Sequence, residues 1–550
     1  MFLEFIGLWG IKFEWKSVSS KTETPQHHAI DSSLTRKSKF PILFPQKGKF
    51  LPEKMPDQQN YIFNLIVFGI YFPILTSISL LVIYKIKLLF CYLIFKNRPP
   101  KPLKRFDDIP FVTIQLPLFN EANVVERLLE SVVSVNFPKE KFEIQVLDDS
   151  TDETIELIKK LVQKYKLKGY NISLLHRINR KDFKAGALAE GLKTAKGEYV
   201  AIFDSDFIIP ENFLNETIHF FTNPKIGMVQ CRWGFINEKE SLLTRLQTTF
   251  LNGHFIIEHT SRNRSGHFFN FNGTAGIWRK SAIFDSGGWS GDTLTEDLDL
   301  SYRAQLRGWK FVYLKDLIAL SELPPTLDAF YGQQFRWAKG MFQVFLKIGP
   351  AIWKSKTSIL NKFDATCHLS SFSGYIFSVL ISILTIPVFF VTKENSDIHF
   401  IAVLFLLINC FMIWFYYFVA EVEARGLKIE SFIYPSLLVI FSVGFSLNGV
   451  YAVKEAVLKK QTPFIRTPKF NNNIRKSFKS DNDAKPVYKA AMFFSAYFIL
   501  LITYILIKGK FNLLPTFIFF SPGYFWLFYK RIREKSQFKQ VFKLSQDLSL

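Results

Sequence analysis

The sequence predicts an α/β domain inserted between membrane-spanning α-helices, and three observations lead to this fold class. An uncharged apolar run over residues 62–84 is long enough to cross the hydrocarbon core of a bilayer as one helix. Further apolar runs return after residue 367. Between these two parts, short β-like runs alternate with helix-like stretches, which is the pattern of a mostly parallel sheet covered by helices.

The composition narrows the class of protein. With 48% hydrophobic and 17% aromatic residues, the chain is too apolar to be disordered. Residues 106–340 hold 28 Lys and Arg against 30 Asp and Glu, so the net charge of +22 lies entirely outside the α/β region. A nucleic-acid-binding domain concentrates positive charge in a folded module, whereas basic residues beside apolar runs are typical of the cytoplasmic face of a membrane. We therefore expect a membrane-embedded protein with no nucleic-acid partner.

Within the α/β region, the expected strands are aliphatic runs that end at polar or turn residues. Two helix-like stretches, over 122–134 and 152–165, separate the first three of them. Because parallel strands need helical crossovers, this alternation places the functional groups at the carboxyl ends of the strands. The expected strands are 112–118, 142–150, 172–178, 198–206 and 227–233.

The length of the apolar runs and the positions of the basic residues predict how the chain crosses the membrane. Seven Lys or Arg between residues 85 and 105 place the following domain in the cytoplasm by the positive-inside rule, and in a bacterium the membrane would be the inner one. A loop over 454–489 holds ten Lys or Arg and is expected on the same side. Three full crossings of the membrane between 367 and 453 would place that loop on the side opposite to the cytoplasm. We therefore expect the run 432–453, which contains Pro435, Gly444 and Gly449, to be re-entrant or interfacial.

These expectations divide the chain into eight parts. They are a poorly ordered extension (1–54), the first transmembrane helix with its basic flank (55–105), the cytoplasmic catalytic domain (106–340), an amphipathic interface segment (341–366), transmembrane or interfacial helices (367–453), a basic cytoplasmic loop (454–489), a transmembrane hairpin (490–528) and a basic cytoplasmic tail (529–550).

Carboxylates gather at the ends of two predicted strands. Asp148 and Asp149 follow one strand, and Asp204 and Asp206 follow another. On a parallel sheet these ends share one edge, and four carboxylates there repel one another unless a cation neutralises them. Mg²⁺ or Mn²⁺ bound by Asp-x-Asp and by phosphate oxygens is the arrangement that suits a nucleotide-diphosphate substrate. A single such pair is more often a turn or a helix cap, but two pairs after buried strands favour the metal site.

Two further groups of residues have side chains suited to catalysis or substrate binding. Thr295-Glu296-Asp297 opens a helix-like stretch, where a carboxylate can be a cap or a base. Gln333-Gln334-Phe335-Arg336-Trp337 places a cation beside an indole, which suits a pyrophosphate and a sugar ring, although such a pair is often only structural.

In this order, the four acidic and aromatic elements resemble the motifs D, DxD, TED and Q-x-x-R-W of membrane-embedded family 2 glycosyltransferases, the group of cellulose synthase and the cellulose synthase-like mannan and glucan synthases. The phrases VTIQLPLFNE (112–121), QVLDDSTDET (145–154), FKAGAL (183–188) and GTAGIWR (273–279) look like the mannan-synthase-like branch. Residues 464–469 are similar to the F-x-V-T-x-K gating-loop motif, with Arg466 in place of Val. The resemblance implies a GT-A-like nucleotide-diphospho-sugar transferase fold for the α/β domain.

The resemblance also implies roles for individual residues. Asp297 would be the general base, with Glu296 and Arg336 as its catalytic neighbours, and Arg336 would stabilise the departing diphosphate. Asp204 and Asp206 would bind Mg²⁺ or Mn²⁺. The residues that would contact the nucleotide sugar are Pro117, Glu121, Asp148, Asp149, Lys184, Asp204, Gln333, Arg336, Trp337, Thr467 and Lys469.

The expected function is that of an inverting hexosyltransferase. It would move a hexose from a UDP- or GDP-sugar to a growing β-linked polysaccharide at the membrane. Transfer of one sugar to a lipid, as in ceramide or diacylglycerol glucosyltransferases, is the nearest alternative. A non-catalytic transporter or scaffold would be expected to have lost acidic motifs, and none is lost here.

Overall fold

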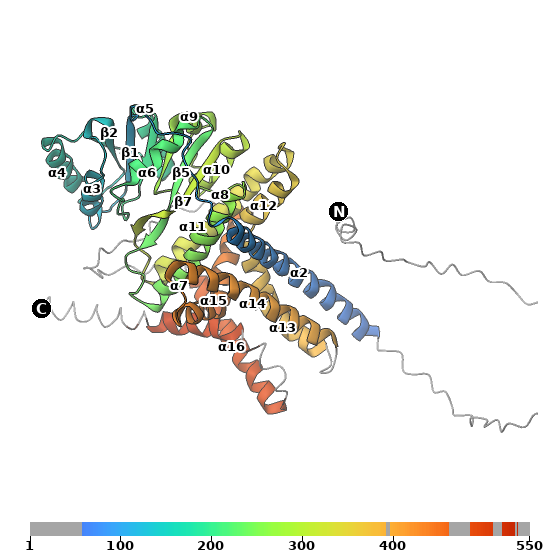
Figure 1. Ribbon diagram of the computed structural model, residues 1–550. Helices are drawn as coiled ribbons and strands as arrows, with labels where there is room; N and C mark the ends of the chain where they lie inside the picture. Colours follow the sequence, from blue (N-terminus) through green and yellow to red (C-terminus); the bar gives the residue numbers. More distant parts are fainter. Residues whose placement is uncertain are drawn as a thin grey trace, which may run out of the picture. The chain divides into compact units, whose positions relative to one another are not determined.

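The computed structural model describes residues 58–391, 397–460, 485–509, 517, 520–533 and 536. The extension 1–54, most of the basic loop and most of the tail lie outside these residues, as do Thr467 and Lys469. The described chain consists of an α/β domain and a set of long apolar helices (Figure 1).

The α/β domain is built on one seven-stranded sheet with the order β3-β2-β1-β4-β6-β5-β7. β6 runs antiparallel to both of its neighbours, and the other pairings are parallel, so the sheet is mostly parallel as expected. All five expected strands are present, and two more, β6 and β7, complete the sheet. The strands are β1 (Val112–Leu118), β2 (Phe142–Asp148), β3 (Ile172–His176), β4 (Tyr199–Ile202), β5 (Ile226–Phe235), β6 (Gly276–Arg279) and β7 (Lys310–Ser321).

Helices bury both faces of this sheet. Along β1, Val112, Ile114 and Leu116 point into a core shared with α3, α4 and α6. The alternate residue Gln115 faces the other side, where its amide donates to Gln145 Oε1 at 3.0 Å and α5 closes over it at Gly191. The bounds are α3 (Val125–Val133), α4 (Thr154–Leu167), α5 (Phe183–Thr194), α6 (Phe213–Thr217), α9 (Lys280–Asp285) and α10 (Glu296–Leu306), with short turns at Lys139–Lys141 and Ile218–Thr222.

One long helical segment links the sheet to the apolar helices. It runs through α7 (Leu242–Asn252), a π-helical stretch at Gly253–His259 and α8 (Thr260–Arg264). Its α7 part packs against α14 (Asp397–Arg425) and α15 (Glu430–Val457), and the π-helical stretch also contacts α2 (Gln58–Phe95) and β5. This segment therefore supports the catalytic domain and the membrane-spanning helices at once.

A buried ion network fixes the first apolar helix, α2 (Gln58–Phe95), to this segment. Lys85 Nζ lies 2.6 Å from Glu258, and Lys87 Nζ lies 2.8 Å from Asp364 of α12. Arg262, which is fully buried, bridges both carboxylates at 3.1 and 2.6 Å. Because each buried charge has a partner of opposite sign, the network holds three separate elements in one arrangement.

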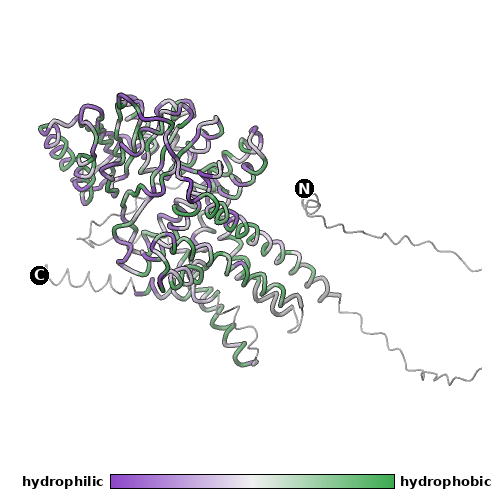
Figure 2. Tube along the Cα trace, in the orientation of Figure 1, coloured by the Kyte–Doolittle hydropathy of each residue, from purple (hydrophilic) through white to green (hydrophobic). Residues whose placement is uncertain are grey.

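Among the described residues, four helices are long and apolar enough to cross a membrane: Phe68–Phe95, Phe400–Arg425, Glu430–Val457 and Pro486–Lys508. α12 and α13 form a further candidate that is bent by 62°. In Figure 2 the long helices are mostly green, whereas the α/β domain alternates between purple and green. The chain is therefore a membrane protein. The helices are α11 (Leu327–Lys354), α12 (Ile359–Leu369), α13 (Ser373–Val391), α14 (Asp397–Arg425), α15 (Glu430–Val457) and α16 (Lys485–Lys508).

Two helices run through residues where the sequence suggested a division. α11 runs unbroken through residue 340, so the α/β domain and the interface segment share one helix. α15 is also continuous through 432–453, where a re-entrant or interfacial run was expected, so this run forms no re-entrant loop. Its glycines serve close helix packing, because a Cβ on Gly444 would lie 2.3 Å from the Gly523 carbonyl oxygen, and one on Gly449 would lie 2.0 Å from the Tyr375 ring. The bend lies earlier, between α12 and α13.

Candidate active site

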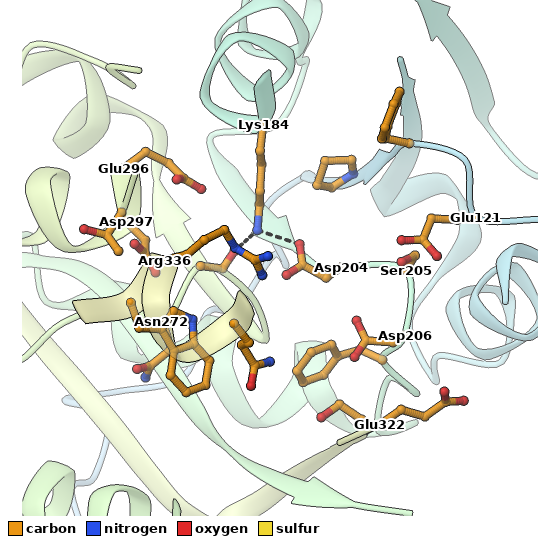
Figure 3. A pocket seen from close by; sticks show the side chains of 18 of the residues that line it. Glu121, Lys184, Asp204, Ser205, Asp206, Asn272, Glu296, Asp297, Glu322 and Arg336 are labelled. Carbon is orange, nitrogen blue, oxygen red and sulfur yellow. Dashed lines mark hydrogen bonds and ion pairs between the residues drawn. The ribbon is translucent and has the colours of Figure 1, made fainter. Parts of the chain in front are cut away.

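A cavity of about 230 Å³ opens at the carboxyl edge of the sheet (Figure 3). It lies where β1, β4, β5 and β7 end, and the starts of α5 and α10 and a face of α11 complete its wall. Eleven residues predicted from the sequence line it: Pro117, Glu121, Asp149, Lys184, Asp204, Asp206, Glu296, Asp297, Gln333, Arg336 and Trp337.

Asp148 is the described residue of the predicted site that does not line this cavity. Its carboxylate is fully buried, accepts from the Ser150 backbone N–H at 3.0 Å and lies 2.7 Å from His176 Nδ1. Asp149 lies one residue beyond the end of β2 and lines the cavity, held by Arg177 Nε at 2.7 Å and Nη2 at 2.5 Å.

Lys184 lies at the centre of the charged groups. Its ammonium donates to Asp204 Oδ1 at 2.5 Å and to the Gly273 carbonyl oxygen at 2.8 Å. Burial alone would lower the pKa of Lys184, but the nearby carboxylates of Asp204, Glu296 and Asp297 outweigh it and raise the pKa. The ammonium is therefore held as a cation by the Asp204 carboxylate and the Gly273 carbonyl oxygen, the two interactions marked in Figure 3.

Asp297 has the properties of a base. Burial, assisted by the neighbouring Glu296 carboxylate, raises its pKa from 3.8 to about 7. Burial also raises the pKa of Glu296. Asp297 stands in the first turn of α10, where Oδ1 accepts from the Leu298 backbone N–H at 2.8 Å. A carboxylate with a pKa near neutrality can both accept and release a proton at physiological pH.

The Q-x-x-R-W residues come from one face of α11. Gln333, Arg336 and Trp337 are spaced three and four residues apart, so a single turn of helix presents all three to the cavity. Burial lowers the pKa of Arg336 to about 10, and Glu296 and Asp204 act against this. The guanidinium therefore stays charged at neutral pH and faces the carboxylates in Figure 3.

The carboxylates fit a divalent cation that is shared with a substrate. Asp204 and Asp206 both line the cavity, and no group of three or more His, Cys, Asp or Glu in the described part of the chain could hold a metal by itself. Mg²⁺ and Mn²⁺ commonly take one or two carboxylates and complete their shell with water and phosphate oxygens. The Lys184 ammonium already holds a positive charge against Asp204, which shows that this position accepts a cation.

Several lining residues were not predicted. The Arg180 guanidinium lies flat against Phe119, 3.3 Å from the ring centroid, beside the end of β1. Asn272 and Trp233 line the floor, and Glu322 follows β7. The phrase GTAGIWR begins next to Asn272 and could have indicated it, whereas no motif indicated Arg180 or Glu322.

A second cavity of about 150 Å³ adjoins the first and shares Asp297, Asn272 and Trp337 with it. It extends between the π-helical stretch, α2 and α12 to Lys85 and His368. A third cavity of about 130 Å³, lined mainly by apolar side chains of α7, α11, α13, α14 and α15, shares residues with the second. The three cavities therefore form a series, each sharing lining residues with the next, from the acidic edge of the sheet to the apolar helices.

Two family models match this region. The model for glycosyl transferase family 2 matches residues 113–284, and the model for glycosyl transferase family group 2 matches residues 199–419. The chain carries a glycosyltransferase family 2 domain. Its mixed sheet with the acidic edge is the GT-A-like fold that the sequence motifs implied, and it is flanked by the apolar helices.

Relatives of this glycosyltransferase domain belong to the mannan-synthase-like branch. A probable glucomannan 4-beta-mannosyltransferase from Oryza sativa subsp. japonica is 44% identical over 262 residues, covering 46% of this chain and 45% of that protein. Glucomannan 4-beta-mannosyltransferase 2 from Arabidopsis thaliana is 42% identical over 310 residues, covering 53% and 58%. The chain thus spans about half the length of the curated relatives it matches. Among solved structures, a mannosyltransferase from Pyrobaculum calidifontis in complex with GDP-Man and Mn²⁺ covers 73% of this chain and 100% of its own, with a TM-score of 0.48 and 17% identity.

Proposed function

We propose that this protein is an inverting glycosyltransferase that moves a hexose from a UDP- or GDP-sugar to a growing β-linked polysaccharide at the membrane. One observation carries the proposal: a buried carboxylate with a pKa of about 7, Asp297, shares one cavity with the Asp204 and Asp206 pair and with Arg336. The names of the relatives favour mannose as the hexose.

In the proposed reaction, the acceptor hydroxyl oxygen attacks the anomeric carbon while the bond from that carbon to the phosphate oxygen breaks. Asp297 takes the hydroxyl proton, which is typically worth about 10²–10⁴-fold in rate. Arg336 stabilises the negative charge that builds on the departing diphosphate. A divalent cation bound to Asp204 and Asp206 would neutralise part of the same charge. A single displacement inverts the anomeric centre, so an α-linked donor gives a β-linked product.

The second cavity supports a sugar acceptor. Four buried polar atoms that line it make no hydrogen bond within the described chain: Asn270 Oδ1, His368 Nε2, Thr295 Oγ1 and Trp233 Nε1. Buried polar groups without partners are costly, so this wall suits a ligand with many hydroxyl groups. Aromatic side chains such as Trp337 and Phe372 offer flat surfaces for sugar rings in the same cavity.

The series of cavities supports elongation of a polymer that leaves through the membrane-spanning helices. The competing proposal is transfer of a single sugar to a lipid, and the apolar lining of the third cavity is the observation in its favour. We further propose that the catalytic domain faces the cytoplasm, because the basic residues around 85–105 flank the domain end of the first membrane-spanning helix.

Release of nucleoside diphosphate tests the activity. The purified protein in detergent is incubated with Mn²⁺ and with either GDP-mannose or UDP-glucose, and free GDP or UDP is measured. We expect release that requires a donor, with GDP-mannose preferred, and that drops at least a hundredfold in Asp297→Asn. Absence of release with both donors, or full activity in the variant, contradicts the proposal.

A further inference from the structure

The position of Lys184 raises a question that its expected role beside a nucleotide does not answer. Its ammonium donates two hydrogen bonds inside the site, to Asp204 Oδ1 at 2.5 Å and to the Gly273 carbonyl oxygen at 2.8 Å. The Asp204 oxygen that it contacts belongs to the carboxylate pair that suits a divalent cation. The lysine and that cation therefore need the same carboxylate.

Neither the helix dipole nor the local backbone conformation favours the position of Lys184. Lys184 stands in the first turn of α5, which has no acidic residue, and the positive end of a helix repels a cation. The two residues before it, Asp182 and Phe183, have φ angles of 58° and 47°, a left-handed conformation that costs energy for residues other than glycine. Arg177 supports this turn by donating from Nη2 to the Phe183 carbonyl oxygen at 2.9 Å. Such a placement persists only where the surroundings enforce it.

The lysine also stands next to the base. A Cβ on Gly273 would lie 3.4 Å from Lys184 Nζ and 3.1 Å from Asp297 Oδ2, so the ammonium and the Asp297 carboxylate flank the same glycine. Figure 3 shows Lys184 reaching down between Asp204 on one side and Glu296 and Asp297 on the other. One cation thus separates two groups of carboxylates that would repel each other without it.

We propose that Lys184 substitutes for the divalent cation on Asp204 in the enzyme without donor, and that the cation must displace it. This inference rests on the proposed function, because it assumes that Asp204 and Asp206 bind Mg²⁺ or Mn²⁺ with a nucleotide sugar. The Gly273 carbonyl oxygen keeps the displaced ammonium in the cavity, where a donor phosphate can accept its hydrogen bond. The site stays folded without metal, and the metal binds strongly only together with the nucleotide.

A consequence is positive coupling between cation and nucleotide. Mn²⁺ alone must break the ion pair of Lys184 with Asp204, whereas with a nucleoside diphosphate present the ammonium gains a new anionic partner. The affinity for Mn²⁺ should therefore rise in the presence of GDP, and by linkage the affinity for GDP should rise by the same factor in the presence of Mn²⁺.

Binding of Mn²⁺ to the full chain in detergent, followed by the electron paramagnetic resonance of free Mn²⁺, tests the proposal. Lys184→Met removes the ammonium and keeps a side chain of similar length. Lys193→Met is the matched control, because Lys193 is on the same helix, is 68% exposed and pairs only with Glu190 in the described contacts. Without nucleotide, we expect Lys184→Met to bind Mn²⁺ at least tenfold more tightly than the wild type, with its coupling to GDP reduced to less than threefold. Lys193→Met should match the wild type.

Equal or weaker Mn²⁺ binding by Lys184→Met without nucleotide overturns the proposal. Thermal unfolding gives a second readout: in EDTA, Lys184→Met should unfold at a lower temperature than the wild type and regain the difference on addition of Mn²⁺. The double variant Lys184→Met/Asp204→Asn should unfold at the temperature of the wild type even without Mn²⁺. If Lys184→Met can be purified only with Mn²⁺ present, the proposal is supported, and if neither Mn²⁺ nor the second substitution recovers it, the proposal is wrong. A wild type that releases nucleoside diphosphate yet shows none of these effects contradicts this inference alone and leaves the proposed function intact.

Discussion

Replacing Asp297 by Asn should weaken catalysis and strengthen the fold at the same time. The pKa of Asp297 is raised from 3.8 to about 7 by burial and by Glu296. An acid whose pKa is raised on folding binds its proton more tightly in the folded state, so its contribution to stability is full below pH 3.8 and is lost as the pH rises toward 7. Each pKa unit corresponds to about 1.4 kcal/mol. Above pH 7, keeping the Asp297 carboxylate ionised in the folded state therefore lowers the free energy of unfolding by about 4 kcal/mol.

Asn cannot ionise and avoids this cost. The unfolding midpoints of wild type and Asp297→Asn in detergent should therefore coincide near pH 4 and separate as the pH rises. Above pH 7 the variant should be more stable by a shift on the order of 10 °C for a domain of this size. Asp316→Asn, at a carboxylate that is 82% exposed, is the control and should show no pH-dependent separation. In parallel, kcat/KM of the wild type should rise with pH through about 7, because only the ionised carboxylate accepts the acceptor proton.

Two results would refute this reasoning. Equal pH dependence of unfolding in wild type and Asp297→Asn would show that the carboxylate is not held in a costly buried position. Activity of the variant within threefold of the wild type would show that another group is the base.

Three further substitutions test other parts of the site and its support. Gly273→Ala forces a left-handed conformation at φ +80° and brings a methyl group 3.1 Å from Asp297 Oδ2, so nucleotide release should fall at least tenfold; unchanged kcat/KM would contradict the placement of the base. Asp206→Asn should abolish the increase in GDP affinity that Mn²⁺ produces, measured by calorimetry, and a retained increase would remove Asp206 from the cation site. Arg262→Met leaves the Asp364 carboxylate, 2.6 Å away in the wild type, with less compensation inside the protein, and should destabilise the chain by about 3–5 kcal/mol; an unchanged unfolding midpoint would show that the ion network is dispensable.

Much of the catalytic domain could be predicted from the sequence because apolar and polar residues alternate along some of its strands and others are apolar throughout. Acidic residues follow several of these strands within a few positions. β1 and β4 are of this kind, and the groups that follow them reach one cavity. The two strands that were missed lack such a pattern. β6 ends at Arg279 and is followed by Lys280, not by an acidic residue, and β7 carries Lys315 and Asp316 in its middle.

Side-chain direction and long-range packing were harder to predict. The adjacent Asp148 and Asp149 were both assigned to the nucleotide; Asp149 lines the cavity, whereas the Asp148 carboxylate lies 2.7 Å from His176 Nδ1. The glycines of α15 suggested a re-entrant or interfacial run when read alone, and their role in close packing became visible only with Gly523 and Tyr375 placed against them. The position of Lys184 on Asp204 depends on a left-handed turn that no sequence pattern indicated.

The size and linkage of the product test the central claim most directly. The purified protein is incubated with radiolabelled GDP-mannose and Mn²⁺, and the product is sized before and after digestion with an endo-acting β-1,4-mannanase. We expect a polymer of many sugar units that the mannanase degrades to short oligosaccharides and that is absent with Asp297→Asn. A single labelled sugar that extracts into organic solvent with lipid would contradict polysaccharide synthesis and favour the glycolipid alternative.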